Sequence, residues 1–192
     1  MKKRFGLVID QERCIGCEAC TVACKIENNS TQNWIQVETQ SAAQQDTPHG
    51  SFPDLEMNFL ARLCNHCDNP PCVDICPTDA LVKREDGPVF LDEEKCDGCE
   101  SCIDACSYGV IFFNQETNKV EKCTLCIHRI DQGLEPFCVL CCEGQAMYFG
   151  DLNDPGSQVS KMIADKNTFQ LNPEANTGPA VYYCPPKPRR RL

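Results

Sequence analysis

Eighteen cysteines in a chain of 192 residues constrain this fold more than any other feature of the sequence. Sixteen of them form four groups of four: Cys14, Cys17, Cys20 and Cys24; Cys64, Cys67, Cys72 and Cys76; Cys96, Cys99, Cys102 and Cys106; and Cys123, Cys126, Cys138 and Cys142. The first and third groups have the spacing C-x2-C-x2-C-x3-C, the second widens the middle gap to four residues and the fourth widens it to eleven. This spacing is typical of cysteines that hold [4Fe–4S] clusters.

The spacing has a physical reason. Three thiolates two residues apart on a tight loop can contact one cluster, whereas the fourth thiolate, three residues further along, has entered a helix and points away. The fourth cysteine therefore binds the neighbouring cluster, and four such groups pair into two double-cluster units. Gly16 and Gly98 allow backbone amides to approach the sulfurs, and Pro77 directly follows Cys76, as in the bacterial ferredoxin run.

Two structural interpretations of the cysteines are weaker. A disulfide framework would have irregular spacing and an extracellular context, and four similar groups of four do not serve that purpose. Zinc ribbons use C-x2-C pairs with longer spacers, so a third cysteine two residues on has no use in a tetrahedral site. Iron–sulfur ligation explains the pattern best.

Composition supports this interpretation and narrows the function. Hydrophobic residues make up 42% of the chain, but this count includes all the cysteines, so the apolar core is thin. We expect the clusters to hold the protein together. The net charge of −10 argues against a general affinity for nucleic acid or an anionic membrane surface. We see no apolar run long enough to span a membrane and no signal-peptide core, so export would depend on a partner's signal.

Short strands and helices are expected around the cysteines. Strands are predicted at 5–9, 59–63, 89–91, 110–113 and 147–149. The polar stretch 27–58 is interpreted as an ordered insertion over the surface. Trp34 is expected to pack against its own strand, and a role as an interface anchor is the alternative. After Gly150 the chain is rich in proline and poor in candidate ligands, which predicts an arm laid over the body.

The chain resembles the four-cluster iron–sulfur subunit of the dimethyl sulfoxide reductase family of molybdopterin oxidoreductases. Besides the cysteines, the resemblance includes ACKIEN at 23–28, CNHCDNPPCV at 64–73, CPT at 76–78, KCTLCIHR at 122–129 and PFC at 136–138. GDL at 150–152 and DP at 154–155 resemble the short members that serve polysulfide, thiosulfate, tetrathionate and arsenate reductases.

The resemblance implies an α+β fold with two ferredoxin-like double-cluster units, one inserted in the other. Residues 1–58 and 108–150 would form the outer unit, residues 59–107 the inner unit and residues 151–192 the C-terminal arm. The implied ligand sets are Cys14, Cys17, Cys20 with Cys142; Cys123, Cys126, Cys138 with Cys24; Cys64, Cys67, Cys72 with Cys106; and Cys96, Cys99, Cys102 with Cys76. Some relatives lack the equivalent of Cys99 and hold a three-iron cluster, so its presence implies four [4Fe–4S] clusters.

By resemblance, the chain relays electrons and does no substrate chemistry itself. Its partners would be a molybdopterin subunit, with molybdenum or tungsten, and a quinone-linked membrane subunit or other redox carrier in anaerobic respiration. The resemblance implies the periplasmic face of the membrane, reached by co-export with the catalytic partner; a cytoplasmic complex is the alternative. The rival functions are a free-standing polyferredoxin and a regulatory or structural metal module.

Four residues outside the ligand sets, two cysteines and two histidines, need separate assignment. Cys141 is adjacent to Cys142, but the x3 spacing from Cys138 favours Cys142 as the ligand. Cys184 is expected to be a free buried thiol. His66 and His128 lie beside cysteines, and because no cysteine is missing, we expect them to hydrogen-bond to backbone or sulfur.

Overall fold

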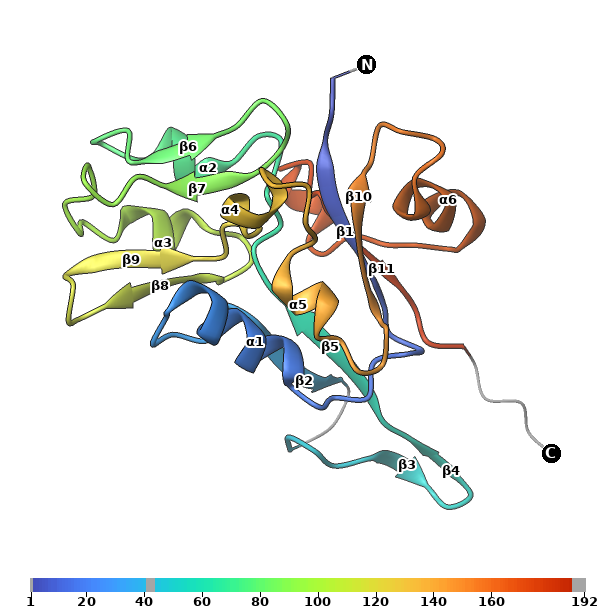
Figure 1. Cartoon of the computed structure of the whole chain (residues 1–192). Coiled ribbons are helices and arrows are strands. Elements are labelled where there is room, and N and C mark those ends of the chain that lie inside the picture. The colour runs from blue at the N-terminus through green and yellow to red at the C-terminus, as the bar shows by residue number, and fades with distance from the viewer. Residues whose placement is uncertain (1, 41–43, 188–192) are drawn as a thin grey trace.

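The structure is a computed structural model that describes residues 2–40 and 44–187 (Figure 1). Its strands are β1 (Phe5–Asp10), β2 (Gln36–Gln40), β3 (His49–Ser51), β4 (Asp54–Glu56), β5 (Asn58–Arg62), β6 (Leu81–Lys83), β7 (Val89–Leu91), β8 (Ile111–Asn114), β9 (Lys119–Lys122), β10 (Met147–Asp151) and β11 (Val181–Cys184). Its helices are α1 (Ala19–Asn28), α2 (Pro71–Asp74), α3 (Ser101–Ala105), α4 (Ile127–Ile130), α5 (Phe137–Leu140) and α6 (Gln158–Asp165), with a 3₁₀ turn at Pro173–Ala175. This mixture of short strands and helices confirms the α+β class.

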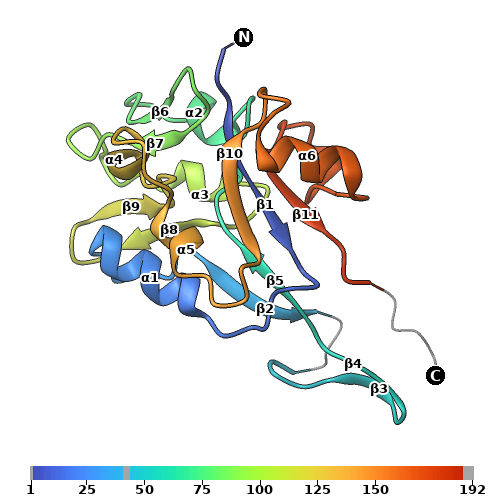
Figure 2. The same cartoon turned by 45° about the vertical axis from the view of Figure 1, so that its right-hand side comes forward.

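The largest sheet has three strands in the order β10-β1-β11 (Figures 1 and 2). The central strand β1 pairs antiparallel with β10 and parallel with β11. Leu7 and Ile9 of β1 lie in the main core, whereas Val8 packs with Val159 of α6 on the opposite face. Because both faces of β1 are covered, its sequence is a continuous apolar run instead of an alternating one.

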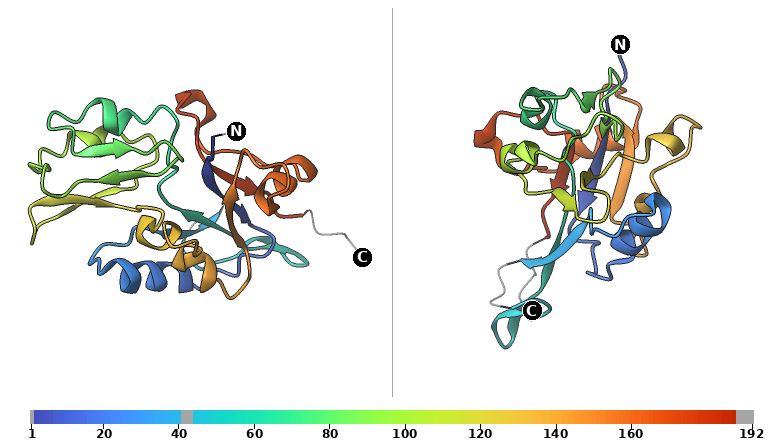
Figure 3. Two further views of the ribbon diagram at one scale, coloured as in Figure 1. Left: turned by 45° about the horizontal axis from the view of Figure 1, so that its top comes forward. Right: turned by 90° about the vertical axis from the view of Figure 1, so that its left-hand side faces the viewer.

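The other strands form two-stranded antiparallel pairs, β2–β5, β3–β4, β6–β7 and β8–β9. The strands predicted from the sequence are confirmed as β1, β5, β7, β8 and β10, with boundaries that shift by at most two residues. In Figure 3, left, the pairs β6–β7 and β8–β9 lie on one side of the molecule, and the sheet with α6 lies on the other.

The C-terminal segment requires a correction, because it is not simply an extended arm. It contains helix α6, whose N-cap Ser157 accepts a hydrogen bond from the backbone of Ser160 at 3.1 Å. It also supplies β11, and the buried Tyr183 donates its hydroxyl proton to the carbonyl of Ala61 at 3.0 Å. The prolines flank these elements without interrupting them, so they did not prevent regular structure. Strand β11 forms because it pairs with the free edge of β1.

The insertion at 27–58 also differs from the expectation of a surface layer. Ile35 is fully buried in the main core, and β2 extends the core by pairing with β5. Trp34 is 8% exposed and donates its indole N–H to Glu121 at 3.1 Å, so it packs within the chain. The hairpin β3–β4 projects from the body and exposes Phe52 at its turn (Figures 1 and 2).

Cysteines contribute to every hydrophobic cluster of the described residues. The main cluster contains Cys24, Cys64, Cys67, Cys123 and Cys138 among its buried residues. The second surrounds Cys72 and Cys102, and the third, beneath α6, contains Cys184. The apolar core is therefore built around the candidate ligands. None of the helices in the described ranges combines the length and apolar character that a membrane span requires.

Candidate iron–sulfur centres

The four cysteine groups share one backbone feature. In each group the residue directly before the second cysteine has a positive φ angle, 69° at Gly16, 44° at His66, 75° at Gly98 and 57° at Leu125. A residue in this left-handed region tightens the turn and lets successive amides face an anion. In the fourth group, the amide of Leu125 donates to Cys123 Sγ at 3.4 Å.

Glycine is required at this turn in the first and third groups for a second reason. A Cβ atom at Gly16 would lie 2.4 Å from the ring of Phe59, and one at Gly98 would lie 2.4 Å from the carbonyl oxygen of Asn118. Both distances are shorter than a carbon atom tolerates. The loops of these two groups are therefore packed tightly against the body.

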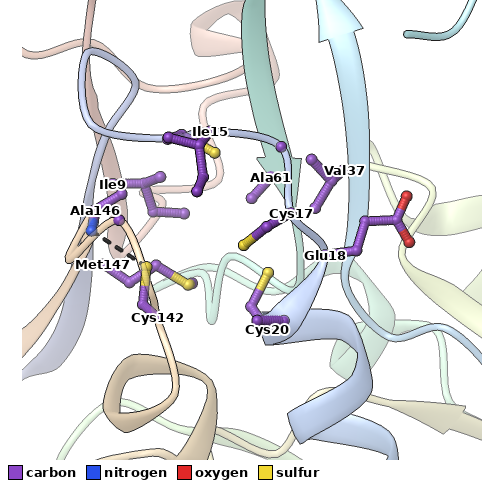
Figure 4. A pocket seen from close by; sticks show the side chains of 14 residues that line it. Ile9, Ile15, Cys17, Glu18, Cys20, Val37, Ala61, Cys142, Ala146 and Met147 are labelled. Atoms are coloured by element: carbon purple, nitrogen blue, oxygen red, sulfur yellow. Dashed lines mark hydrogen bonds between the residues drawn. The ribbon is translucent and has the colours of Figure 1, made fainter.

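The first cavity is lined by Cys14, Cys17 and Cys20 from the first loop and by Cys142, which follows α5 (Figure 4). The empty volume between these residues, counting the space open to solvent, is about 380 Å³, and the remaining walls are mainly apolar. The sulfurs of Cys17, Cys20 and Cys142 point toward the same space in Figure 4. The fold thus brings the last cysteine of the fourth group to the first three cysteines of the first group.

Two further cavities have the same construction. One is lined by Cys64, Cys67, Cys72 and Cys106 and has an empty volume of about 360 Å³. The other is lined by Cys76, Cys96, Cys99 and Cys102 and has an empty volume of about 270 Å³. In each of them, three cysteines of one group meet the fourth cysteine of its neighbour.

The remaining four cysteines converge where α1 packs against α5. The side-chain amide nitrogen of Asn28 lies 3.7 Å from Cys24 Sγ and 3.9 Å from Cys126 Sγ. These two sulfurs are therefore neighbours that share one N–H donor group. Burial, followed by the charges of Cys123, Cys126 and Cys24, raises the pKa of Cys138. The structure therefore brings all four sequence-predicted sets together.

Backbone amides distinguish Cys142 from its neighbour Cys141. The amide of Ala146 donates to Cys142 Sγ at 3.2 Å, and in the same relation the amide of Ala80 donates to Cys76 Sγ at 3.3 Å. Cys142 thus has the environment of another fourth-position cysteine. Cys141 is the C-cap of α5 and is not among the residues that line the first cavity.

The donor chemistry fits a multinuclear cationic group. Burial and, to a smaller extent, the charges of neighbouring sulfurs together raise the pKa of Cys20, Cys24 and Cys72 to about 12 each. Four thiolates in one apolar cavity are thus unfavourable without a positive partner. No group of three or more His, Cys, Asp or Glu residues in the described ranges is arranged for a single metal ion. A four-iron cluster is larger than one ion and holds its thiolates farther apart, so it suits these cavities.

The four sets lie in a fixed order. Helix α1 carries Cys20 of the first set and Cys24 of the Cys123 set. Burial and then the charges of Cys24 and Cys64 raise the pKa of Cys123, which places the Cys64 set next to the Cys123 set. Helices α2 and α3, which pack together, join the Cys64 set to the Cys96 set.

The ends of this order reach the surface. Every cysteine lies in the described ranges, and Cys17 and Cys99 are the exposed ones. Cys17 belongs to the first set and Cys99 to the last, whereas the two middle sets are mostly buried. The arrangement connects two exposed sites through a protected interior.

The two histidines differ from each other. His66 is 1% exposed; its Nδ1 accepts the amide of Val89 at 3.0 Å, and its Nε2 lies 3.6 Å from Cys123 Sγ. This confirms the expected contacts to backbone and sulfur. The expectation was wrong for His128, whose Nε2 contacts the carboxylate of Glu27 at 2.8 Å, because His128 lies on the exposed side of α4.

Sequence reasoning missed two lysines near the cysteines, the buried Lys122 and the half-buried Lys83. Lys122 is 2% exposed, and its ammonium donates to the carbonyls of Val89 and Cys123. Lys83 donates to the carbonyls of His66, Cys67 and Gly87 at 3.0, 2.7 and 2.7 Å. Lysine is rarely buried, so the residue type alone gave no signal for either lysine. For Lys122, the position directly before Cys123 was the only available indication.

Cys184 is 2% exposed, as expected for a buried thiol. It packs with Val8 and Val159 beneath α6, close to the ion pair between Lys166 and Asp10. Burial raises its pKa, so the neutral thiol is favoured. It belongs to none of the four cysteine sets.

Comparison with known families identifies the class first. Residues 8–80 and residues 55–152 each match a family described as a 4Fe-4S dicluster domain. The second match covers half of the chain. The protein is therefore an iron–sulfur protein of the dicluster type, and two dicluster domains correspond to four [4Fe–4S] clusters.

Individual relatives narrow the class. The chain is 42% identical over 184 residues to a subunit of tetrathionate reductase from Salmonella typhimurium, covering 95% of this chain and 72% of the relative. It is 37% identical to the arsenate respiratory reductase iron-sulfur subunit of a Shewanella species, covering 94% and 95%. It is 35% identical to one of the chains of polysulfide reductase from Wolinella succinogenes, covering 97% of both. The chain belongs to the iron–sulfur subunits of the dimethyl sulfoxide reductase family.

Proposed function

We propose that this chain relays electrons between a molybdopterin-bearing catalytic subunit and a second redox partner. The observation that carries the proposal is the ordered series of four cysteine sets, with exposed Cys17 at one end and exposed Cys99 at the other. Bound [4Fe–4S] clusters supply one-electron chemistry, and the protein sets their spacing, solvent access and potential.

The proposed ligands are the sixteen cysteines in their four sets. They are Cys14, Cys17, Cys20 and Cys142; Cys24, Cys123, Cys126 and Cys138; Cys64, Cys67, Cys72 and Cys106; and Cys76, Cys96, Cys99 and Cys102. The lining of the three cavities supports three of these sets, and the Asn28 contacts support the remaining one.

The crossing of ligands also supports two nested units. In the proposed arrangement, residues 59–107 form an inner ferredoxin-like unit and residues 1–58 with 108–150 form the outer one. The packing of α2 on α3 joins the inner sets, and the packing of α1 on α5 joins the outer sets. The segment from 151 onward then completes the outer unit through β11.

The relatives support the type of partner. They are named as parts of tetrathionate, arsenate and polysulfide reductases, which is consistent with a separate catalytic subunit that performs the substrate chemistry. A quinone-linked membrane subunit is the proposed partner at the other end. We further propose a location on the periplasmic face of the membrane, reached by co-export with the catalytic subunit; a cytoplasmic complex is the alternative.

Anoxic purification from native cells tests the proposal. We expect this chain to co-purify with a polypeptide that contains molybdopterin and to be reoxidised when that complex receives its oxidised substrate. A cluster-loaded chain that purifies alone and exchanges electrons with soluble carriers would instead support the free-standing polyferredoxin.

A further inference from the structure

The imidazole of His66 crosses the boundary between the two proposed units. Its backbone belongs to the loop between Cys64 and Cys67, in the inner unit. Its Nε2 lies 3.6 Å from the sulfur of Cys123, in the outer unit. His66 therefore joins two cysteine sets that are adjacent in the proposed order of electron transfer.

The hydrogen bonds of the ring fix where its proton lies. The amide N–H of Val89 can only donate, and it points to Nδ1 at 3.0 Å. Nδ1 is therefore the acceptor, and a neutral imidazole carries its proton on Nε2. The atom that faces Cys123 Sγ is thus a donor, as is common for groups that support a metal ligand from behind.

The surroundings hold the ring in place. His66 is 1% exposed, and the ammonium of Lys83 donates to its carbonyl oxygen at 3.0 Å. The ammonium of Lys122 donates to the carbonyls of Val89 and Cys123, the two residues that the imidazole contacts. Asp68 is the carboxylate that pairs with Lys83, at 3.6 Å. Ring and sulfur are therefore positioned by the same hydrogen-bond network, in which Lys122 is buried and Lys83 is half-buried.

We propose that His66 donates a hydrogen bond from Nε2 to the Cys123 thiolate and thereby raises the reduction potential of the cluster bound by the Cys123 set. This rests on the proposed function, in which Cys123 is a ligand. Reduction adds negative charge that is shared with the ligand sulfurs, so a donor aimed at one sulfur favours the reduced state. His66 is thus a positioning residue that adjusts the electron-transfer step between the two units.

Two substitutions distinguish the effect of the Nε2–H donor from the effect of the rest of the His66 side chain. His66→Asn preserves an acceptor close to the position of Nδ1 and tolerates the positive φ angle of 44°, but it is too short to reach Cys123. His66→Gln places an amide N–H close to the position of Nε2. His128→Asn is the matched control, because His128 lies near the same group of cysteines but pairs with Glu27.

The primary measurement is an anoxic redox titration followed by electron paramagnetic resonance, with the Cys123 cluster assigned as the signal that Cys126→Ser removes. For His66→Asn we expect the ratio of reduced to oxidised Cys123 cluster at fixed potential to fall about tenfold, equivalent to about 59 mV for one electron. We expect His66→Gln and His128→Asn to titrate like the wild type. An unchanged potential in His66→Asn, with all clusters present, overturns the proposal.

A second measurement uses the unaltered protein, so it does not depend on the variants folding. Protein labelled with ¹⁵N at histidine should show a nitrogen coupling and an exchangeable proton coupling to the reduced Cys123 cluster in electron–nuclear double resonance. Absence of both couplings contradicts the hydrogen bond. Failure of the wild type to bind four clusters would contradict the proposed function instead, so the two failures are distinguishable.

Discussion

The first and third cysteine groups differ from the second and fourth in more than spacing. The regular groups have glycine at the left-handed turn and an exposed second cysteine, Cys17 or Cys99. The stretched groups have His66 or Leu125 at that turn, 1% and 2% exposed, and a buried second cysteine. The regular loops therefore face solvent at the ends of the proposed path, whereas the stretched loops fill the interior with their own side chains.

The largest expected difference between these regions comes from removing one ligand in each. Cys123→Ser should lose the whole cluster and lower the thermal midpoint strongly, because Cys123 lies in the main core. Cys99→Ser, at the surface, should affect one cluster and leave the other three and most of the stability. Anoxic iron analysis and circular dichroism measure both effects, and equal losses would remove the distinction between interior and end.

The crossing of ligands between groups gives the next prediction. Cys142→Ser should remove the same paramagnetic component as Cys14→Ser, although 142 − 14 = 128 positions separate the two residues. Cys24→Ser should instead remove the component that depends on Cys123. If Cys24→Ser and Cys14→Ser abolish the same component, the assignment is wrong.

Cys141→Ser is the control for that series. It should preserve all four components, because Cys142 receives the amide of Ala146 and lines the first cavity. Loss of a cluster in Cys141→Ser, with Cys142→Ser tolerated, would reverse the choice of ligand.

The role of bulky side chains at the interior turns can be tested at Leu125. Leu125→Ala should lower the stability of the loaded protein by about 2–5 kcal/mol, the usual cost of such a cavity. Leu134→Ala, at a leucine that is 47% exposed, should change it by less than about 0.5 kcal/mol. Thermal midpoints under anoxic conditions compare the two, and similar shifts would show that Leu125 does not fill the interior.

The smallest expected difference in stability concerns the glycine at the left-handed turn of the regular groups. Gly98→Ala combines a left-handed backbone with a Cβ 2.4 Å from the Asn118 carbonyl oxygen, whereas Gly109→Ala has a similar φ angle and no atom within 4 Å. Gly109→Ala should cost about 1–2 kcal/mol from the backbone alone, and Gly98→Ala should cost more. Equal midpoints for these variants would mean that the loop moves away without cost.

The sequence predicted the four cysteine groups because cluster ligation requires fixed spacing, whereas the four ligand sets were implied by the family resemblance. It predicted the strands because they are short apolar runs. It did not predict β11, because the pairing of residues 181–184 with β1 depends on an edge that only the folded chain presents. It missed Lys122 for a similar reason: the carbonyl of Val89, one of the two that accept from its ammonium, lies 33 positions away in sequence. Glu27, the partner of His128, lies even farther away, 101 positions earlier in the sequence.

The number of clusters per chain tests the central claim most directly. Protein made and purified under anoxic conditions should contain about sixteen iron and about sixteen acid-labile sulfide per polypeptide, because each of the four cysteine sets holds one [4Fe–4S] cluster. Reconstituted protein that saturates at about eight iron atoms per polypeptide, half of the expected content, would contradict a path of four clusters.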